Sequence, residues 1–251
     1  MRVMTWNLLT DSAVEVPSWA ARAPVLAAGV ADLAPTVLGT QEGSAGMLDD
    51  LVSRLGSRYR WVGEGRAGRG QDETCAVVYD STQLTLLDVR NRWLSDAPEQ
   101  PGSRACDADL PRIFTSARFH DSETGVIFSV VNTHLDHTGE QARVAGATIV
   151  AAEAAAGPAV VTGDFNAVAE ASEAYDVALA SGLVDALAPR DRLARRLRTF
   201  TGRDRSLIGE GEQIDWILVT RNVAVTDAWV EEGPQAYASD HRPVLADLVF
   251  A

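Results

Sequence analysis

The chain has 251 residues, of which 46% are hydrophobic and 23% are charged, and it carries a formal net charge of −13. This composition is ordinary for a soluble globular protein, and the length fits one large α/β domain or two small ones. The negative charge argues against avid, non-specific nucleic-acid binding, which usually needs a basic face. No stretch approaches the roughly 20 uninterrupted apolar residues that span a bilayer, so we expect no membrane-spanning segment.

Strand-like and helix-like patterns alternate from end to end, without a long linker, a low-complexity tract or a repeat. We therefore predict a single α/β domain over residues 1–251. Strands are predicted at 2–9, 37–41, 59–62, 74–79, 84–94, 113–119, 126–135, 159–162, 214–219, 223–230 and 244–250, and helices at 19–33, 45–55, 141–155 and 172–180. Short turns join several of these elements, which favours antiparallel pairing and a mixed sheet over a purely parallel one.

The first residues enter a strand pattern at once, with neither a basic nor an apolar leader, so we expect no secretory signal. The two cysteines, Cys75 and Cys106, have neither a disulfide-framework spacing nor a metal-ligand spacing. We therefore predict a reducing, cytoplasmic compartment, and we expect the protein to be a monomer.

The charge is unevenly distributed, because residues 190–205 hold seven arginines against two aspartates, a local charge of +5. One interpretation is a solvated helix face. The other is a segment that borders the active site and captures an anionic substrate. The pattern alone leaves both open.

Polar side chains gather where the predicted strands end. Asp164 and Asn166 follow the apolar run 158–162, which is typical of a strand covered on both faces. Ligands bind α/β sheets at such carboxyl ends, and residues two apart on an extended chain point the same way. Asp164 and Asn166 are therefore predicted to face one substrate. As an isolated cluster they could also be turn formers.

A second cluster ends the predicted strand at 126–135. A lone histidine there is more often structural, but Asn132 and His134 share the same strand parity, which favours a functional role for His134. His137 follows three residues later, past the predicted strand end. A loop or capping role and a functional role are both open for it.

Two oxygen-bearing residues indicate a hard metal ion. Glu42 ends an otherwise apolar strand, and a carboxylate there should be paired, exposed or metal-bound, because burying it alone is costly. Asn7 interrupts another apolar strand. Such oxygen ligands suit Mg²⁺ or Mn²⁺ rather than zinc, and the four histidines and two unclustered cysteines of the chain agree with that choice.

His241 is the strongest candidate for a base. A histidine in acid–base work usually needs a partner that fixes its tautomer. Asp240 precedes it directly, and neighbours on an extended chain point in opposite directions, so Asp240 is a better metal or water ligand than an orienting partner. We predict that Asp215, at the head of the apolar strand 214–219, orients His241 instead.

Taken together these clusters resemble those of the endonuclease/exonuclease/phosphatase superfamily, from Met4-Thr5-Trp6-Asn7 to Ser239-Asp240-His241-Arg242-Pro243. The superfamily includes deoxyribonucleases, inositol-polyphosphate phosphatases, neutral sphingomyelinases and poly(A) deadenylases. The resemblance implies a four-layered α/β sandwich, with two packed mixed β-sheets flanked by helices and the site at one edge.

The resemblance also implies roles for the residues of the clusters. Asn7, Glu42 and Asp240 would lie near the metal, and His134 and Asn166 would contact the phosphate. Asp164 would position or deprotonate the attacking water. Asp215 would orient His241, which would act on the scissile phosphate or on the water.

Other motifs narrow the resemblance to one branch. Leu9 stands where apurinic endonucleases typically carry an acidic residue, whereas 73–79 and 132–137 look like the deadenylase and sphingomyelinase-like branch and its bacterial relatives. The segment Leu110-Pro111-Arg112 is also similar to those bacterial members. We expect Arg112, together with His137, to reach the substrate phosphate.

The predicted activity is metal-dependent hydrolysis of a phosphodiester or phosphomonoester by in-line attack of water. The acidic composition favours a small phosphorylated metabolite or a lipid headgroup as substrate. A nuclease acting on DNA or RNA is the alternative, with the arginines of 190–205 as its basic surface. A non-catalytic binding module that kept the fold is a more remote alternative.

Overall fold

The computed structural model describes residues 1–11, 17–188, 197–202, 204, 209 and 211–250, and this part of the chain forms two six-stranded sheets. The first sheet has the order β11 (Val223–Val230), β12 (Val244–Phe250), β1 (Arg2–Asn7), β2 (Val37–Gly43), β4 (Thr74–Asp80) and β3 (Tyr59–Val62). The second has the order β5 (Leu84–Trp93), β6 (Ile113–Asp121), β7 (Ile127–His134), β8 (Ala159–Asp164), β10 (Asp215–Thr220) and β9 (Leu183–Asp185).

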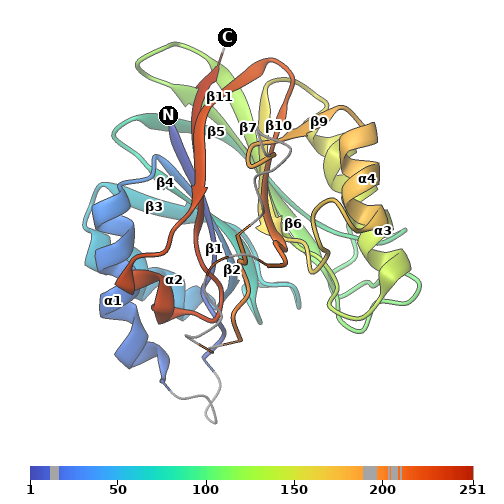
Figure 1. Cartoon of the computed structure of the whole chain (residues 1–251), viewed down its shortest axis with the longest axis horizontal. Helices are drawn as coiled ribbons and strands as arrows, with labels where there is room; N and C mark the ends of the chain where they lie inside the picture. The colour runs from blue at the N-terminus through green and yellow to red at the C-terminus, as the bar shows by residue number, and fades with distance from the viewer. Residues whose placement is uncertain (12–16, 189–196, 203, 205–208, 210, 251) are drawn as a thin grey trace.

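Helices cover the outer face of each sheet, as Figure 1 shows. The helices α1 (Trp19–Leu33) and α2 (Ala45–Leu55) share one apolar cluster with the first sheet, and the short η1 (Pro234–Ala238) contributes to it. The helices α3 (Glu140–Ala154) and α4 (Glu173–Ala180) share another with the second sheet. A third cluster fills the space between the sheets. The predicted four-layered sandwich is thus confirmed.

Both sheets are mixed, also as predicted. The pairs β1–β2 and β7–β8 are parallel, and the other paired strands are antiparallel. Parallel neighbours need a crossover, which α1 supplies in the first sheet and α3 in the second. None of the helices in the described ranges has the length and apolarity needed to cross a membrane.

The sequence predicts most elements to within two residues, and the differences are informative. The strand predicted at 159–162 runs on to Asp164, so Asp164 lies in β8 rather than after it, because it pairs with neighbours on both sides. The strand predicted at 2–9 stops at Asn7, because Leu9 has a left-handed φ of 58°. The short β9 and η1 were not predicted. Most of the basic segment 190–205 lies outside the described residues.

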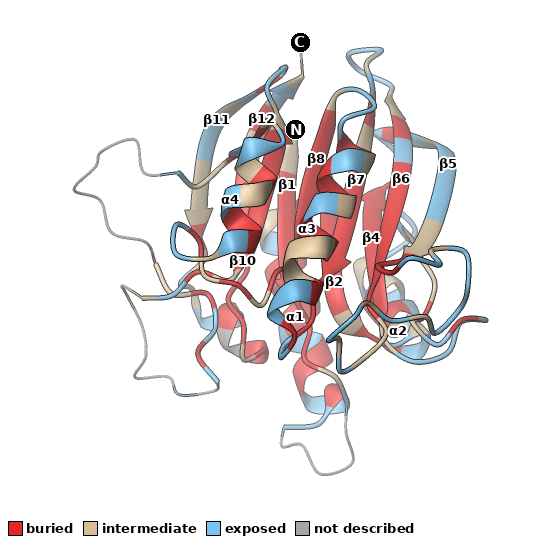
Figure 2. Cartoon of the chain, turned by 90° about the vertical axis from the view of Figure 1, so that its right-hand side faces the viewer, coloured by how far each residue is buried: buried red, intermediate tan, exposed pale blue. Residues whose placement is uncertain are grey.

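Strict alternation along the strands sorts side chains between layers. Val3 and Val160 lie in the cluster between the sheets, whereas Met4 and Val161 face the helices. By this parity the later residues Asn7, Asn132, His134, Asp164 and Asp215 turn toward the space between the sheets. Figure 2 shows the central strands almost entirely buried, with the exposed residues on the outer helix faces, the loops and the edge strands β5 and β11.

One buried amide joins the two sheets. Asn132, on β7, donates from Nδ2 to the carbonyl oxygens of Thr40 (2.8 Å) and Ala76 (2.9 Å) in the first sheet. Its Oδ1 accepts from Nε2 of Gln41 (2.7 Å) and Oγ1 of Thr162 (3.0 Å). All four hydrogen bonds of the amide are thereby made.

The sheets approach so closely at this amide that only a glycine fits opposite it. A Cβ on Gly39 would lie 2.2 Å from Oγ1 of Thr162 and 2.7 Å from Oδ1 of Asn132. The hydrogen bonds of Asn132 therefore join the two sheets at the position where the apolar cluster between them ends and the polar residues begin.

We predict that Asn132→Ala lowers the free energy of unfolding by at least about 2 kcal/mol, because it leaves several buried donors and acceptors unpaired. Chemical denaturation measures the change. Asn222→Ala removes an exposed asparagine that accepts a hydrogen bond from Thr220 and should change stability by about 0.5 kcal/mol or less. Equal effects of the two substitutions would contradict the inter-sheet role of Asn132.

Candidate active site

Three of the predicted residues are direct cross-strand neighbours. His134 on β7 is in register with Asp164 on β8, and Asp164 is in register with Asp215 on β10. All three are buried, with at most 7% of each residue exposed. Because they share the inter-sheet parity, their side chains project into the same space at the end of the sandwich.

Glu42 reaches this space only because β2 is irregular. By alternation, Gln41 points between the sheets and Glu42 would point toward the helices. The pairing of β2 with β4 shifts register between Thr40 and Gly43, and Glu42 has a left-handed φ of 63°. Bulges of this kind redirect side chains, and a non-glycine residue at positive φ is strained, a feature that clusters at functional sites.

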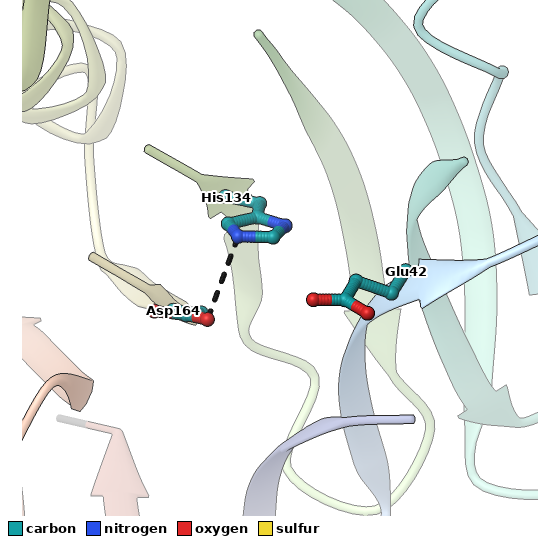
Figure 3. Close-up of side chains that lie close together, drawn as sticks. All are labelled: Glu42, His134 and Asp164. Atoms are coloured by element: carbon teal, nitrogen blue, oxygen red, sulfur yellow. Dashed lines mark ion pairs between the residues drawn. The ribbon is translucent and has the colours of Figure 1, made fainter. Parts of the chain in front are cut away.

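Asn7 draws the two carboxylates together across the sheets. Its Nδ2 donates to Oε1 of Glu42 (2.9 Å) and to Oδ2 of Asp164 (3.0 Å), while its Oδ1 accepts from the N–H of Leu9 (3.0 Å). The other oxygen of Glu42 accepts from the N–H of Thr10 (2.9 Å). Figure 3 shows Glu42 approaching His134 and Asp164 from the opposite side of the site.

The donor set fits a hard divalent cation. Ligand atoms of Glu42, His134 and Asp164 lie within 4.8 Å of one another. The carboxylates of Glu42 and Asp164 converge on one point, where both accept a hydrogen bond from the partly positive Nδ2 of Asn7. Oxygen-rich sites of this kind suit Mg²⁺ or Mn²⁺.

His241 is held by Asp215, as the parity of Asp240 and His241 led us to expect. Its Nδ1 lies 2.9 Å from Oδ2 and 3.2 Å from Oδ1 of Asp215. Burial lowers the pKa of His241, but the charges of Asp215 and Asp164 and the hydrogen bond to Asp215 outweigh it, so its pKa is raised above the usual value. The imidazole is therefore held in its charged form at neutral pH.

His134 is in the opposite state. Its Nε2 lies 3.0 Å from Nδ2 of Asn166, which is a donor and also donates to the carbonyl of Leu135 (3.0 Å). With that assignment Nε2 accepts and the proton sits on Nδ1. Burial, with the nearby charges of Arg112 and His241, lowers the pKa of His134 well below its usual value. The ring is therefore neutral.

Asp164 lies between the two imidazoles. Its Oδ2 is 3.5 Å from Nε2 of His134 and 3.6 Å from Nε2 of His241, and its Oδ1 accepts from the N–H of Asn166 (2.9 Å). Burial raises the pKa of Asp164, and the charge of His241 offsets this in part. A carboxylate whose pKa moves toward neutrality is suited to accept a proton at physiological pH.

Comparison with known proteins identifies the family. The sequence profile of the Endonuclease/Exonuclease/phosphatase family matches residues 4–241. The chain belongs to this family. Its members are phosphoesterases and nucleases, so the resemblance drawn from the strand-end clusters is confirmed. A comparison with curated proteins finds no match.

Solved structures of family members superpose along the whole chain. An endonuclease/exonuclease/phosphatase from Bacteroides vulgatus is 34% identical, with a TM-score of 0.90 over 100% of this chain and 98% of that one. A mannosyl-6-phosphatase from Bacteroides thetaiotaomicron is 32% identical, with a TM-score of 0.86 over 100% of both chains. The human Nocturnin catalytic domain, at 22% identity, has a TM-score of 0.78 over 100% of this chain and 94% of that one, and shares the fold.

The segment that carries Asp240 and His241 is anchored to β1. Oγ of Ser239 donates to the carbonyl of Asn7 (2.6 Å) and accepts from the N–H of His241 (3.2 Å), and Nε1 of Trp6 donates to the carbonyl of His241 (3.0 Å). The metal predicted for this family site would therefore meet residues from three segments fixed to one another.

Asp240 is half-buried, and burial raises its pKa, while the charge of His241 lowers it and that of Glu42 raises it. Oδ1 of Asp240 accepts from Oγ of Ser239 (3.3 Å). Asp240 is not part of the compact Glu42, His134 and Asp164 group found among the described residues.

Arg112 borders the site, but Asp136 and His137 hold it. Its Nε donates to Oδ2 of Asp136 (3.4 Å), and its Nη2 lies 3.0 Å from Nδ1 of His137. His137, predicted to touch the phosphate, lies half-exposed behind Arg112, with its Nε2 3.6 Å from Asp109. The structure thus places Arg112 beside Glu42 and His134, with His137 in contact with Arg112.

Sequence reasoning missed two supporting features. Asp136 accepts from the N–H groups of Leu110 (3.3 Å), Thr138 (3.1 Å) and Gly139 (2.8 Å) as well as from Arg112, and its place two residues after His134 was the only signal. Arg66, from the glycine-rich loop, lines a pocket with Glu42, Arg112 and His134. The position of Arg66 as the first basic residue of that loop did not indicate that it lines the pocket.

The substitution Asp136→Asn tests whether the charge of the carboxylate that holds Arg112 stabilises the fold. Burial alone would raise the pKa of Asp136, but its backbone hydrogen bonds outweigh this and hold the pKa well below the usual value. A depressed folded-state pKa stabilises the fold above the unfolded pKa of about 4, and this stabilisation is lost as pH falls through the folded pKa. The variant should therefore lose about 1–3 kcal/mol at pH 7.

Urea denaturation between neutral and acidic pH measures this prediction. The difference between Asp136→Asn and the wild type should shrink as the pH falls below about 4. Asp88→Asn alters an exposed carboxylate on β5 and serves as the matched control. A difference that stays constant with pH would contradict the assigned charge state.

Proposed function

We propose that this chain is a metal-dependent phosphoesterase that hydrolyses a phosphate ester by in-line attack of water. The observation that carries the proposal is the arrangement around Asp164. A buried carboxylate with a raised pKa lies between a neutral and a charged histidine, 3.5 and 3.6 Å away, and a second carboxylate approaches from the other sheet. Family membership supports the reaction class.

Asn7, Glu42 and Asp240 are the residues that we propose would hold Mg²⁺ or Mn²⁺. Oδ1 of Asn7, which accepts from the N–H of Leu9, has a second lone pair for the ion. When bound, such a cation polarises a phosphoryl oxygen and offsets negative charge in the transition state.

The side chains of the chain perform the remaining steps. Asp164 orients the attacking water and accepts its proton. His241, kept charged and oriented by Asp215, donates from Nε2 to a phosphoryl oxygen. His134 holds the phosphate from the other side by donating from Nδ1. The Nδ2 group of Asn166 donates to His134 and Leu135, so Asn166 supports the phosphate site by fixing the tautomer of His134. Arg112, with His137 behind it, adds positive charge at the rim.

A small phosphorylated metabolite is the proposed substrate, with sugar phosphates as its first representatives. The body of the chain is acidic, which disfavours long polyanions. The mannosyl-6-phosphatase at 32% identity covers the full chain, and its activity on a sugar phosphate supports the same substrate class here. A lipid headgroup offers the same phosphate chemistry and belongs in the same substrate panel.

A nuclease is the second candidate, and the sequence feature that favours it is the group of arginines in 190–205. Most of that segment lies outside the described residues, so the nuclease alternative depends on the sequence alone. A nuclease that contacts several phosphates would lose activity steeply with salt, whereas a small-molecule phosphatase would lose much less.

We predict that Asp164→Ala and His241→Ala each reduce turnover by at least about 10²-fold, because each removes a positioned acid–base group. The substrates are sugar phosphates, inositol phosphates, sphingomyelin, DNA and RNA, supplied with Mn²⁺. His120→Gln changes a histidine on β6 away from the site and serves as the control. Near wild-type activity in either alanine variant, with the fold intact by circular dichroism, would remove that residue from the mechanism.

Metal removal should silence the enzyme. EDTA is expected to abolish hydrolysis and Mg²⁺ or Mn²⁺ to restore it, because the proposed ligands are oxygens. Calorimetric titration of Mn²⁺ should show weaker binding to Glu42→Gln than to the wild type. Restoration by Zn²⁺ alone would argue against the oxygen-ligand assignment. Absence of any Mn²⁺ binding would favour the non-catalytic binding module.

A further inference from the structure

A second arginine, Arg66, lies at the site beside Arg112. The two arginines line one small pocket together with Glu42, Glu73 and His134. Both arginines are nearly buried, with 12% and 6% of their side chains exposed. Their charges both contribute to lowering the pKa of His134, in agreement with their position beside its ring.

Arg66 is fixed by its backbone rather than carried on a free loop. Its N–H donates to the carbonyl of Glu73 (2.9 Å), and its carbonyl accepts from Nε1 of Trp93 (2.7 Å). The hairpin that carries it closes tightly, because a Cβ on Gly65 would lie 1.9 Å from the carbonyl oxygen of Gln71. The guanidinium is therefore presented in one place before any ligand arrives, which lowers the entropic cost of binding.

Hydrogen-bonding capacity remains on both guanidinium groups. Nε of Arg66 lies 3.1 Å from Oδ2 of Asp72 and its Nη1 lies 2.9 Å from Oε2 of Glu73; the contact of Nε is an ion pair without hydrogen-bond geometry. Arg112 uses Nε and Nη2 on Asp136 and His137. Within the described part of the chain, Nη2 of Arg66 and Nη1 of Arg112 make no hydrogen bond. Two arginines with unused donors at one pocket are suited to an anion.

The pocket is small enough to select between phosphate esters. Its cavity volume is about 10 Å³, room for about one water-sized group, and Cys75 and Ile113 are apolar residues of its lining. A terminal phosphate has a third non-bridging oxygen that fits such a space. A phosphodiester carries a carbon substituent on that oxygen, which the space excludes, and it has one negative charge fewer.

We propose that Arg66, with Arg112, forms a pocket for the third non-bridging oxygen of a terminal phosphate and thereby selects phosphomonoesters over phosphodiesters. This assignment rests on the proposed phosphoesterase activity and names its substrate class. Arg66 acts as a specificity-determining residue, because it binds an oxygen that is present only in the monoester.

The test compares Arg66→Gln with the wild type on para-nitrophenyl phosphate and bis(para-nitrophenyl) phosphate, each supplied with Mn²⁺. The wild type should prefer the monoester. Arg66→Gln should lower kcat/KM for the monoester by about 10- to 100-fold, as expected for losing a hydrogen bond to a charged group, and should change kcat/KM for the diester by less than about threefold. The preference should therefore fall by about tenfold or more.

A binding measurement separates recognition from turnover. Inorganic phosphate should bind Asp164→Asn at least about tenfold more tightly than the double variant Arg66→Gln/Asp164→Asn by calorimetry. Arg54→Gln alters an arginine paired with Asp50 on α2 and is the matched control for both measurements.

The outcomes distinguish the two proposals. If the wild type hydrolyses both esters and Arg66→Gln leaves their ratio and phosphate affinity unchanged, the pocket assignment is wrong while the proposed function stands. If the wild type hydrolyses the diester better than the monoester, the pocket assignment is also wrong. If the wild type hydrolyses neither ester nor any other phosphate ester, the proposed function itself is wrong.

Discussion

The register of three neighbouring strands is the constraint on which the site depends. His134, Asp164 and Asp215 occupy matching positions on β7, β8 and β10, and period-two alternation turns all three into the space between the sheets. A slip of one residue in any strand would turn its functional side chain to the other face. The Asn132 amide, bonded to both sheets, holds the second sheet at the distance where Asn7 and Glu42 can meet Asp164.

The buried environment then divides the chemistry between two histidines. Burial with nearby cations keeps His134 neutral, and the Asp215 carboxylate keeps His241 charged despite its burial. One ring accepts from Asn166 and leaves its other nitrogen as a donor, while the other ring offers a charged donor. Asp164, between them, has its pKa raised by burial. General acid–base hydrolysis requires a group that accepts a proton close to a group that donates one, and Asp164 and His241 have these two states.

Most of this architecture could be predicted from the sequence, because alternating hydrophobicity marks the strands and polar residues mark their ends. Parity argued against Asp240 as the partner of His241, the place of Asp215 at the head of an apolar strand favoured it instead, and the structure has that contact. The direction of Glu42 could not be predicted, because it depends on a bulge and a left-handed φ at that residue. Arg66 could not be predicted either, since its place depends on long-range contacts of a hairpin with Trp93 and Glu73.

We infer that the strand ends form one phosphate and metal site shared by the two sheets. The decisive measurement is a crystal structure of the protein soaked with Mn²⁺ and inorganic phosphate, with anomalous scattering to locate manganese. We expect a manganese peak in contact with Glu42 and a phosphate between His134 and His241. A manganese peak elsewhere, or a phosphate bound away from Asp164, would show that this inference is wrong.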